Sequence, residues 1–232
     1  MDKSAKKDLI NSVKTYLDSH IMAGVGMLAV RRENISIPSY IFTASDDCLE
    51  DRWEELYKEC VGCRLCELSK TRTNVVFGEG NKSAKIVFIG EAPGRDEDLQ
   101  AKPFVGRAGQ LLTRMIEAMN LKRTDVYICN VLKCRPPDNR PPQQIEISVC
   151  RKYLEKQIEL ISPKVICTLG RYAAQTILGT IDGITTFRGK QGVYKNIPVI
   201  PTYHPAYLLR NLSAKQDTWE DLQKVTKILE QN

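Results

Sequence analysis

The sequence has no long hydrophobic run and contains little histidine, with 2 in 232 residues. Its longest apolar stretch spans residues 21–30 and is interrupted by Gly24 and Gly26, whereas a membrane-spanning helix needs about 20 apolar residues. The residues before this stretch mix Lys and Asp, which is not the pattern of a signal peptide. We therefore expect a cytoplasmic protein without membrane association.

Cysteine is too scarce for a disulfide scaffold, since the chain contains 8 cysteines. Thiols in a chain of this length more often bind a metal or stay reduced, which agrees with a reducing compartment. Hydrophobic residues make up 42% and charged residues 27% of the chain, values that exclude disordered and collagen-like proteins. The length predicts one domain with an appendage.

Residues 1–59 differ from the rest of the chain. Apolar residues recur at helical spacing over residues 9–21 and 49–57, which predicts two helices joined by a connector that contains Ser and Pro. We predict an N-terminal helical extension over residues 1–59 and one domain over residues 60–232. The sequence leaves open whether the extension packs against this domain or contacts a partner.

Short apolar runs alternate with helical patterns beyond residue 84. Helical spacing predicts helices over residues 109–119 and 142–161. Alternating strands and helices predict an α/β fold, with right-handed crossovers and a mainly parallel sheet covered by helices on both faces. The runs that predict buried strands are residues 86–89, 126–132, 165–169 and 199–201.

Ligands of open parallel sheets bind beyond the carboxyl ends of the strands, so the residues after each predicted strand are candidates for a functional site. Residues 90–94 form a glycine-containing turn whose spacing fits neither a Walker loop nor a dinucleotide-binding motif. Glu91 and Glu97 can orient a water molecule or stabilise developing positive charge there. A purely structural turn is the alternative.

Two polar residues stand out at the ends of other predicted strands. Asn130 follows an apolar run, where a buried amide needs hydrogen-bond partners. It can form hydrogen bonds with the polar edge of a pyrimidine, or it can be a core residue whose partners lie within the protein. His204 lies between Tyr203 and Pro205. A neutral imidazole there can donate a hydrogen bond to an oxygen that gains negative charge.

The cysteines have the spacing of a metal site. Cys60 and Cys63 form a C-x₂-C motif that Cys66 extends, and Cys134 and Cys150 follow far along the chain. Four thiolates fit either zinc or an iron–sulfur cluster. The other cysteines, Cys129 and Cys167 inside apolar runs and Cys48 without a nameable partner, carry no metal prediction.

The formal net charge of +6 is compatible with a polyanionic partner. Residues 99–116 and 183–216 contain basic residues and no acidic ones, and residues 134–142 form a loop stiffened by four prolines. We expect these segments to face phosphate groups, although ordinary solvated faces have the same composition. The basic residues are Lys102, Arg107, Arg114, Arg135, Arg140, Arg188, Lys190, Lys195, Arg210 and Lys215.

Taken together, these segments resemble the family four uracil-DNA glycosylases, which are the iron–sulfur members of the uracil-DNA glycosylase superfamily. The resemblance covers residues 60–211. It is carried by several motifs in order, namely CVGCRL at residues 60–65, VFGEGN at 76–81, GEAPG at 90–94, PFVGRAGQLL at 103–112, NVLKCRPP at 130–137 and HPAYLLR at 204–210.

The resemblance implies a three-layer α/β/α sandwich that excises uracil from DNA. It assigns a [4Fe–4S] cluster to Cys60, Cys63, Cys134 and Cys150, which would clamp the proline loop rather than transfer electrons. For the pocket, it implies that Phe104 stacks on the extruded uracil, that Asn130 reads its polar edge and that His204 stabilises the departing base. Backbone contacts would come from Gly90, Ala92 and Gly94, while Glu91 or Glu97 would handle water or the sugar cation.

The residues themselves predict the DNA contacts of such an enzyme. Leu208 and Leu209 can insert into the vacated base stack or be core leucines of a helix, and Arg107 and Arg210 would lie near phosphates. We expect a monomer that acts on single- or double-stranded uracil-containing DNA and is associated with the nucleoid. The alternative is a non-catalytic DNA-binding iron–sulfur adaptor of replication or repair.

Overall fold

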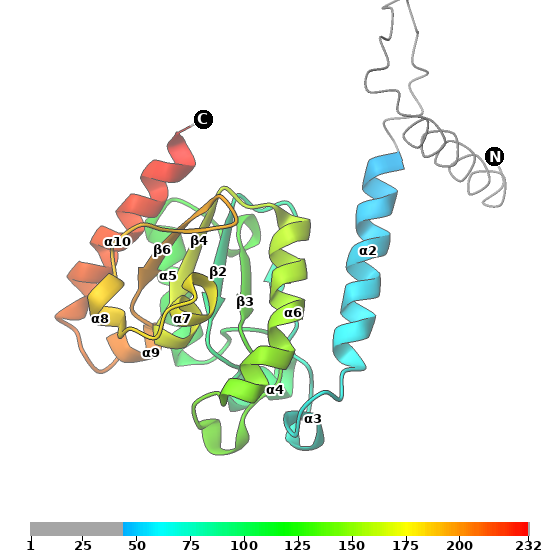
Figure 1. Ribbon diagram of the computed structural model, residues 1–232. Coiled ribbons are helices and arrows are strands. Elements are labelled where there is room, and N and C mark those ends of the chain that lie inside the picture. The colour runs from blue at the N-terminus through cyan, green and yellow to red at the C-terminus, as the bar shows by residue number, and fades with distance from the viewer. Residues whose placement is uncertain (1–43, 232) are drawn as a thin grey trace, which may run out of the picture. The chain divides into compact units, whose positions relative to one another are not determined.

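Six strands form one sheet, in the order β1-β3-β2-β4-β6-β5. The computed structural model describes residues 44–231, so the helix predicted over residues 9–21 lies outside the described residues. The four inner strands are parallel, and Figure 1 shows them side by side from β3 to β6. Antiparallel strands complete both edges. The bounds are Glu79–Gly80 for β1, Ile86–Gly90 for β2, Tyr127–Asn130 for β3, Val165–Leu169 for β4, Gly192–Tyr194 for β5 and Ile197–Thr202 for β6.

All four predicted strands are confirmed as β2, β3, β4 and β6. The second is shorter than predicted, because the chain leaves the sheet after Asn130. The edge strands β1 and β5 escape prediction because they contain only two and three residues, too few to show an alternating pattern.

The inner strands are buried on both faces, and successive residues point to opposite sides of the sheet. Val87 and Ile89 face one hydrophobic cluster, while Ile86 and Phe88 face the other. The first cluster includes residues of α2 (Ala44–Val61), α6 (Gln144–Ile161) and α7 (Arg171–Leu178), and the second residues of α5 (Arg107–Ala118), α9 (Pro205–Leu208) and α10 (Ala214–Glu230). The predicted three-layer α/β/α sandwich is therefore confirmed.

Short helices connect these layers. They are α3 (Leu68–Thr71), α4 (Arg95–Gln100), α8 (Ile184–Phe187) and two 3₁₀ turns at Arg123–Asp125 and Pro137–Asn139. The helices predicted over residues 109–119 and 142–161 correspond to α5 and α6. Glu146 starts α6 by accepting a hydrogen bond from the backbone N–H of Gln143 at 2.8 Å.

Helix α2 begins before the boundary that the sequence suggests at residue 59 and packs as part of the domain. Trp53 is buried, and its ring lies edge-on to Phe77 and Tyr127 at centroid distances of 5.7 and 5.4 Å. These aromatic contacts stabilise the helix that leads into Cys60. The limits of the N-terminal extension stay a prediction, because residues 1–43 lie outside the described part.

None of the helices between residues 44 and 231 combines the length and the apolarity that a bilayer crossing requires. Cys129 and Cys167 are fully buried in β3 and β4, as predicted for small core residues.

Candidate active site

A cavity of about 460 Å³ lies beyond the carboxyl ends of the parallel strands. The loops after β2, β3 and β6 meet there, and the proline loop closes one side. Its walls unite most residues that the sequence singles out: Glu91, Ala92, Gly94, Glu97, Phe104, Asn130, His204 and Arg210. Further wall residues, to which the sequence assigns no pocket role, include Pro136, Asn139, Ala206 and Tyr207.

Phe104 forms an aromatic wall of the cavity. Its backbone has φ +54°, a left-handed conformation that a bulky residue adopts at an energetic cost. The chain at Phe104 passes so close to Gly109 that any side chain at Gly109 would overlap the Phe104 carbonyl. The Phe104 ring lies 5.6 Å from the His204 ring with an interplanar angle of 30°, so both rings face the same space.

Gly90 ends β2 directly behind this wall. A Cβ atom at Gly90 would lie 2.5 Å from the Cζ atom of Phe104 and closer still to the Oδ1 atom of Asn130. Glycine is therefore required here because of close approach rather than backbone conformation.

Asn130 carries a hydrogen-bond acceptor without a partner. The residue is 2% exposed, and its Oδ1 atom is buried with no hydrogen-bond partner among the described residues. A buried acceptor left unpaired costs about 1–3 kcal/mol, and native proteins keep few such groups. An Oδ1 atom in the wall of a polar cavity is therefore well placed to accept a hydrogen bond from a ligand.

His204 has a defined tautomer. Its Nδ1 atom accepts a hydrogen bond from the backbone N–H of Ala206 at 3.1 Å, which leaves the proton of a neutral ring on Nε2. Burial lowers the pKa of His204 from 6.5 to about 4, because the charged form is poorly solvated there. The ring is thus neutral at pH 7 and able to donate from Nε2.

The two candidate carboxylates differ in what they bind. Glu97 accepts three backbone N–H groups, from Gly94 at 3.1 Å, Val105 at 3.0 Å and Gly106 at 3.2 Å. It therefore ties the turn after β2 to the loop that carries Phe104. Burial raises the pKa of Glu91, an effect that the nearby Arg171 opposes.

The cysteines of the predicted cluster gather in one hydrophobic region. Cys60, Cys134 and Cys150 are buried, and Cys63 packs against the same group of side chains. Burial raises the pKa of Cys60 and of Cys150 to about 12, so that a bound cation is needed to hold them as thiolates. Over residues 44–231, no set of three or more ligating side chains is arranged around a single ion.

Arg72 holds the cysteine loop together. Its Nη1 atom donates to the Sγ atom of Cys134 at 3.0 Å, and its Nη2 atom donates to the carbonyls of Val61 and Cys63 at 3.0 and 2.9 Å. Donors aimed at a sulfur ligand orient it and stabilise its negative charge. Cys66 is the fifth thiol of this region. It is half-buried and packs against the same hydrophobic side chains as Cys63.

Lys133 connects the cysteine region to the pocket. Its backbone N–H donates to the Sγ atom of Cys150 at 3.3 Å. Its side chain, 1% exposed, donates to the carbonyl of Asn130 at 2.9 Å and to Gln157 at 2.6 Å. The strand end that presents Asn130 is therefore bonded to the segment that presents Cys134.

The structure corrects the prediction for Leu208, whereas the role predicted for Leu209 stays a prediction. Leu208 is 1% exposed and lies in the core between the sheet and α5, and Leu209 is half-buried against the same cluster. A residue that inserts into DNA must be available at the surface, so this packing does not fit the role predicted for Leu208. The short helix α9 turns the leucine side inward and leaves Tyr207 outside.

Two of the predicted phosphate contacts are instead engaged in ion pairs. Arg188 is held by Asp217 at 3.1 Å and by buried Asp221 at 2.9 Å, and Arg140 by Glu146 at 2.6 Å. Their guanidinium groups serve the fold, because removing one partner would leave a buried carboxylate unpaired. Arg107 and Arg210 are exposed, and of these only Arg210 lines the cavity.

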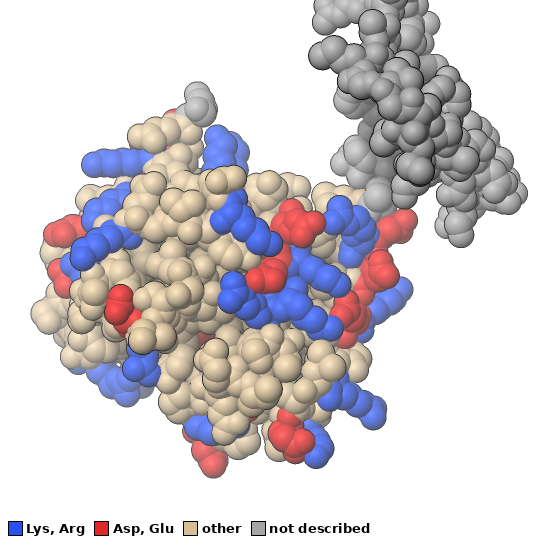
Figure 2. Space-filling view, viewed as in Figure 1, with Lys and Arg blue, Asp and Glu red and all other residues tan. Residues whose placement is uncertain are grey.

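The face formed by α6 and α2 is not a candidate surface for binding phosphate groups. Figure 2 shows basic and acidic side chains interspersed there. Glu59 pairs with Lys152 at 2.6 Å and with Lys156 at 3.0 Å, so these lysines are compensated within the protein.

Comparison with known proteins gives the family of the chain. The Uracil DNA glycosylase superfamily model matches residues 77–223. The chain is 48% identical over 183 residues to the type-4 uracil-DNA glycosylase of Archaeoglobus fulgidus, covering 75% of this chain and 92% of that protein. It is 45% identical to the type-4 enzyme of Thermotoga maritima, covering 78% and 96%, and 28% identical to the type-5 enzyme of Pyrobaculum aerophilum, covering 64% and 72%. The chain thus belongs to the uracil-DNA glycosylase superfamily and, within it, to the type-4 uracil-DNA glycosylases.

Proposed function

We propose that this chain hydrolyses the N-glycosidic bond of uracil in DNA within the cavity bounded by Phe104, Asn130 and His204. The observation that carries the assignment is the unpaired Oδ1 atom of Asn130. Uracil has a hydrogen atom on ring N3 and can donate it to this acceptor, whereas N3 of cytosine has none. Because a site built to hydrogen-bond one ring edge rejects analogues that lack it, the acceptor favours uracil over cytosine.

The base must leave the helix to reach this acceptor. Extrusion breaks stacking and pairing at a cost of a few kcal/mol, which is lowest in a mismatch or a single strand. Phe104 offers a ring on which the extruded base stacks. Gly90 keeps the space between that ring and the amide of Asn130 free of a side chain.

His204 acts on the departing base. As the bond between C1′ and uracil N1 breaks, its electron pair moves onto the uracil ring and negative charge accumulates on O2. The neutral imidazole donates a hydrogen bond from Nε2 to that oxygen. A preorganised donor of this kind contributes about 10² to 10³ in rate.

Glu91 acts on the sugar. Positive charge spreads over the deoxyribose as the base departs, and a carboxylate in a partly buried cavity stabilises it. The same carboxylate orients the water whose oxygen bonds to C1′ and accepts its proton. We assign this role to Glu91 rather than Glu97, because both carboxylate oxygens of Glu97 already accept backbone N–H groups.

Four cysteines fit an iron–sulfur cluster. Cys60, Cys63, Cys134 and Cys150 would hold a [4Fe–4S] group, whose four thiolates stand further apart than those around one zinc ion. The N–H donors aimed at two of the sulfurs fit thiolates that ligate a metal group. When bound, the group supplies cross-links between the C-x₂-C loop and the proline loop.

One assay tests the activity and separates it from the adaptor alternative. The protein is incubated with a uracil-containing oligonucleotide, and the product is treated with alkali, which cleaves abasic sites. Strand scission at the uracil supports the proposal; intact strands, with cluster absorbance present, would favour a non-catalytic adaptor. Iron and sulfide analysis tests the cofactor, since stoichiometric zinc would refute it.

Location and assembly belong to the same proposal. We infer a monomer in the cytoplasm, associated with the nucleoid through its DNA substrate. Size-exclusion chromatography with light scattering tests the assembly, because a dimer mass would contradict a monomer.

A further inference from the structure

Tyr207 has no role in the mechanism above, yet it lies at the mouth of the cavity. It contributes to the cavity wall and is 41% exposed. The leucine that follows it is 1% exposed. An exposed aromatic ring is thus presented near His204, where Leu208, one of the two leucines predicted to insert into DNA, is buried.

The ring of Tyr207 is backed by a stack. Tyr203 lies against it at a centroid distance of 4.9 Å and an interplanar angle of 30°. The guanidinium carbon of Arg188 lies 5.5 Å from the centroid of the Tyr203 ring. Planar groups in this arrangement support one another through stacking and cation–π attraction.

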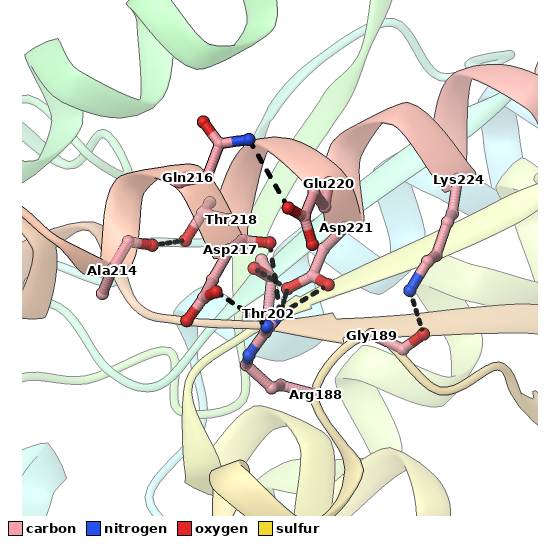
Figure 3. A network of polar contacts seen from close by, with 10 residues as sticks. All are labelled: Arg188, Gly189, Thr202, Ala214, Gln216, Asp217, Thr218, Glu220, Asp221 and Lys224. Carbon is pink, nitrogen blue, oxygen red and sulfur yellow. Dashed lines mark hydrogen bonds and ion pairs between the residues drawn. The ribbon is translucent and has the colours of Figure 1, made fainter.

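The base of the stack is fixed to the core, as Figure 3 shows. Asp221, which is 0% exposed, accepts two hydrogen bonds from Nη1 of Arg188 at 2.9 and 3.1 Å and one from Thr202 Oγ1 at 2.8 Å. Asp217 adds an ion pair with Arg188 at 3.1 Å. A rigid support lowers the entropy lost when the outer ring meets a ligand.

Extrusion of a base leaves a gap in the duplex. Proteins that disturb stacking often fill such gaps with a side chain, and a planar ring stacks on any neighbouring base because every base has a π face. A backed tyrosine at the mouth of the base pocket has the position and the shape for this task.

We propose that Tyr207 stacks into the duplex beside the extruded uracil and stabilises the flipped state. The inference rests on the proposed glycosylase function and deepens it. A single strand has no helical stack to restore, so Tyr207 contributes to the reaction on duplex DNA and not to the chemistry in the pocket.

The test compares Tyr207→Ala, Tyr207→Phe and wild type in single-turnover excision from a duplex and from a single strand of the same sequence. We expect Tyr207→Ala to be slower on the duplex by about 5- to 100-fold, the range of one base–aromatic stack, and within about 2-fold of wild type on the single strand. Tyr207→Phe keeps the ring and should retain the wild-type rate on both.

Tyr57→Ala is the matched control. Tyr57 lies on α2, is 45% exposed and packs edge-on against Phe77. A second readout is affinity for a duplex that carries a tetrahydrofuran abasic-site analogue, in which the gap already exists. Tyr207→Ala should weaken this affinity, while Tyr207→Phe and Tyr57→Ala should not.

Three results would overturn the inference: an unchanged duplex rate, an equal loss on both substrates, or an unchanged affinity for the abasic analogue. Wild-type protein that excises uracil from neither substrate would instead overturn the proposed function. The two failures are therefore distinguishable.

Discussion

Replacing Gly90 with alanine tests the geometry of the proposed base pocket. The added Cβ would lie 2.5 Å from Phe104 Cζ and closer to Asn130 Oδ1, whereas ordinary contact begins at 3.4 Å. The Phe104 ring must therefore retreat by about 0.9 Å, and the amide by at least as much. Neither group can move freely, because Phe104 has a left-handed backbone and Asn130 ends a buried strand.

The expected effect follows from that displacement. A misplacement of about 1 Å in a catalytic arrangement lowers the rate by about 10²-fold, so we expect kcat/KM for excision to fall by about two orders of magnitude. Overpacking a core costs about 1–3 kcal/mol, so the free energy of unfolding should fall by a similar amount while the protein still folds.

Single-turnover excision and thermal unfolding measure the two effects. Gly183→Ala is a suitable control: Gly183 precedes α8 with an ordinary φ of −75°, and a Cβ there would meet nothing nearer than 3.9 Å. Full activity of Gly90→Ala, with unchanged stability, would refute the proposed binding of uracil against Phe104 and Asn130.

Three further predictions concern individual side chains. Glu91→Gln should lower kcat by about 10²- to 10⁴-fold and remove the acid limb of the wild-type pH–rate profile. The midpoint of that limb should lie above 4.5, because burial raises the pKa of Glu91. An unaltered profile would exclude Glu91 as the catalytic carboxylate. The pKa of His204 is about 4 in the folded protein and 6.5 when the side chain is exposed. Below pH 6.5 the unfolded state therefore binds one more proton, and the free energy of unfolding should fall by up to about 3 kcal/mol from pH 6.5 to pH 4. Chemical denaturation at both pH values should show that His204→Asn reduces this difference. Arg72→Gln should speed the release of iron to a chelator, measured by loss of cluster absorbance, because Cys134 loses a donor; release at the wild-type rate would contradict the role of Arg72.

The contacts around Glu97, Arg72 and Lys133 form one continuous support for the pocket. Buried Asp98 accepts backbone N–H groups of Thr73 and Asn74 at 3.0 and 3.2 Å, which joins the segment after Arg72 to α4, where Glu97 lies. The cysteine region thus braces two walls of the pocket, through α4 and through Lys133. If these cysteines hold the proposed cluster, its loss should therefore alter the pocket as well as the cysteine loop.

Sequence alone predicted the four inner strands and most of the residues that line the cavity. The apolar runs of β2, β3, β4 and β6 are local signals, because a fully buried parallel strand needs several apolar residues in succession. Once these strands are predicted, the residues at their carboxyl ends become candidates without further information. Asn130 and His204 were found in this way, and the motifs added Phe104 and the four cysteines.

Only the tertiary structure decided which side chains are free to act. It assigns Glu97 and Arg188 to supporting contacts, turns Leu208 into the core, leaves Tyr207 outside and sets the tautomer of His204 through the N–H of Ala206. Most of these outcomes depend on partners far apart in the chain, such as Asp221 for Arg188 and α5 for Leu208. Local patterns show which residues are apolar or charged, but the availability of a group depends on what packs against it, which becomes defined only when the layers come together.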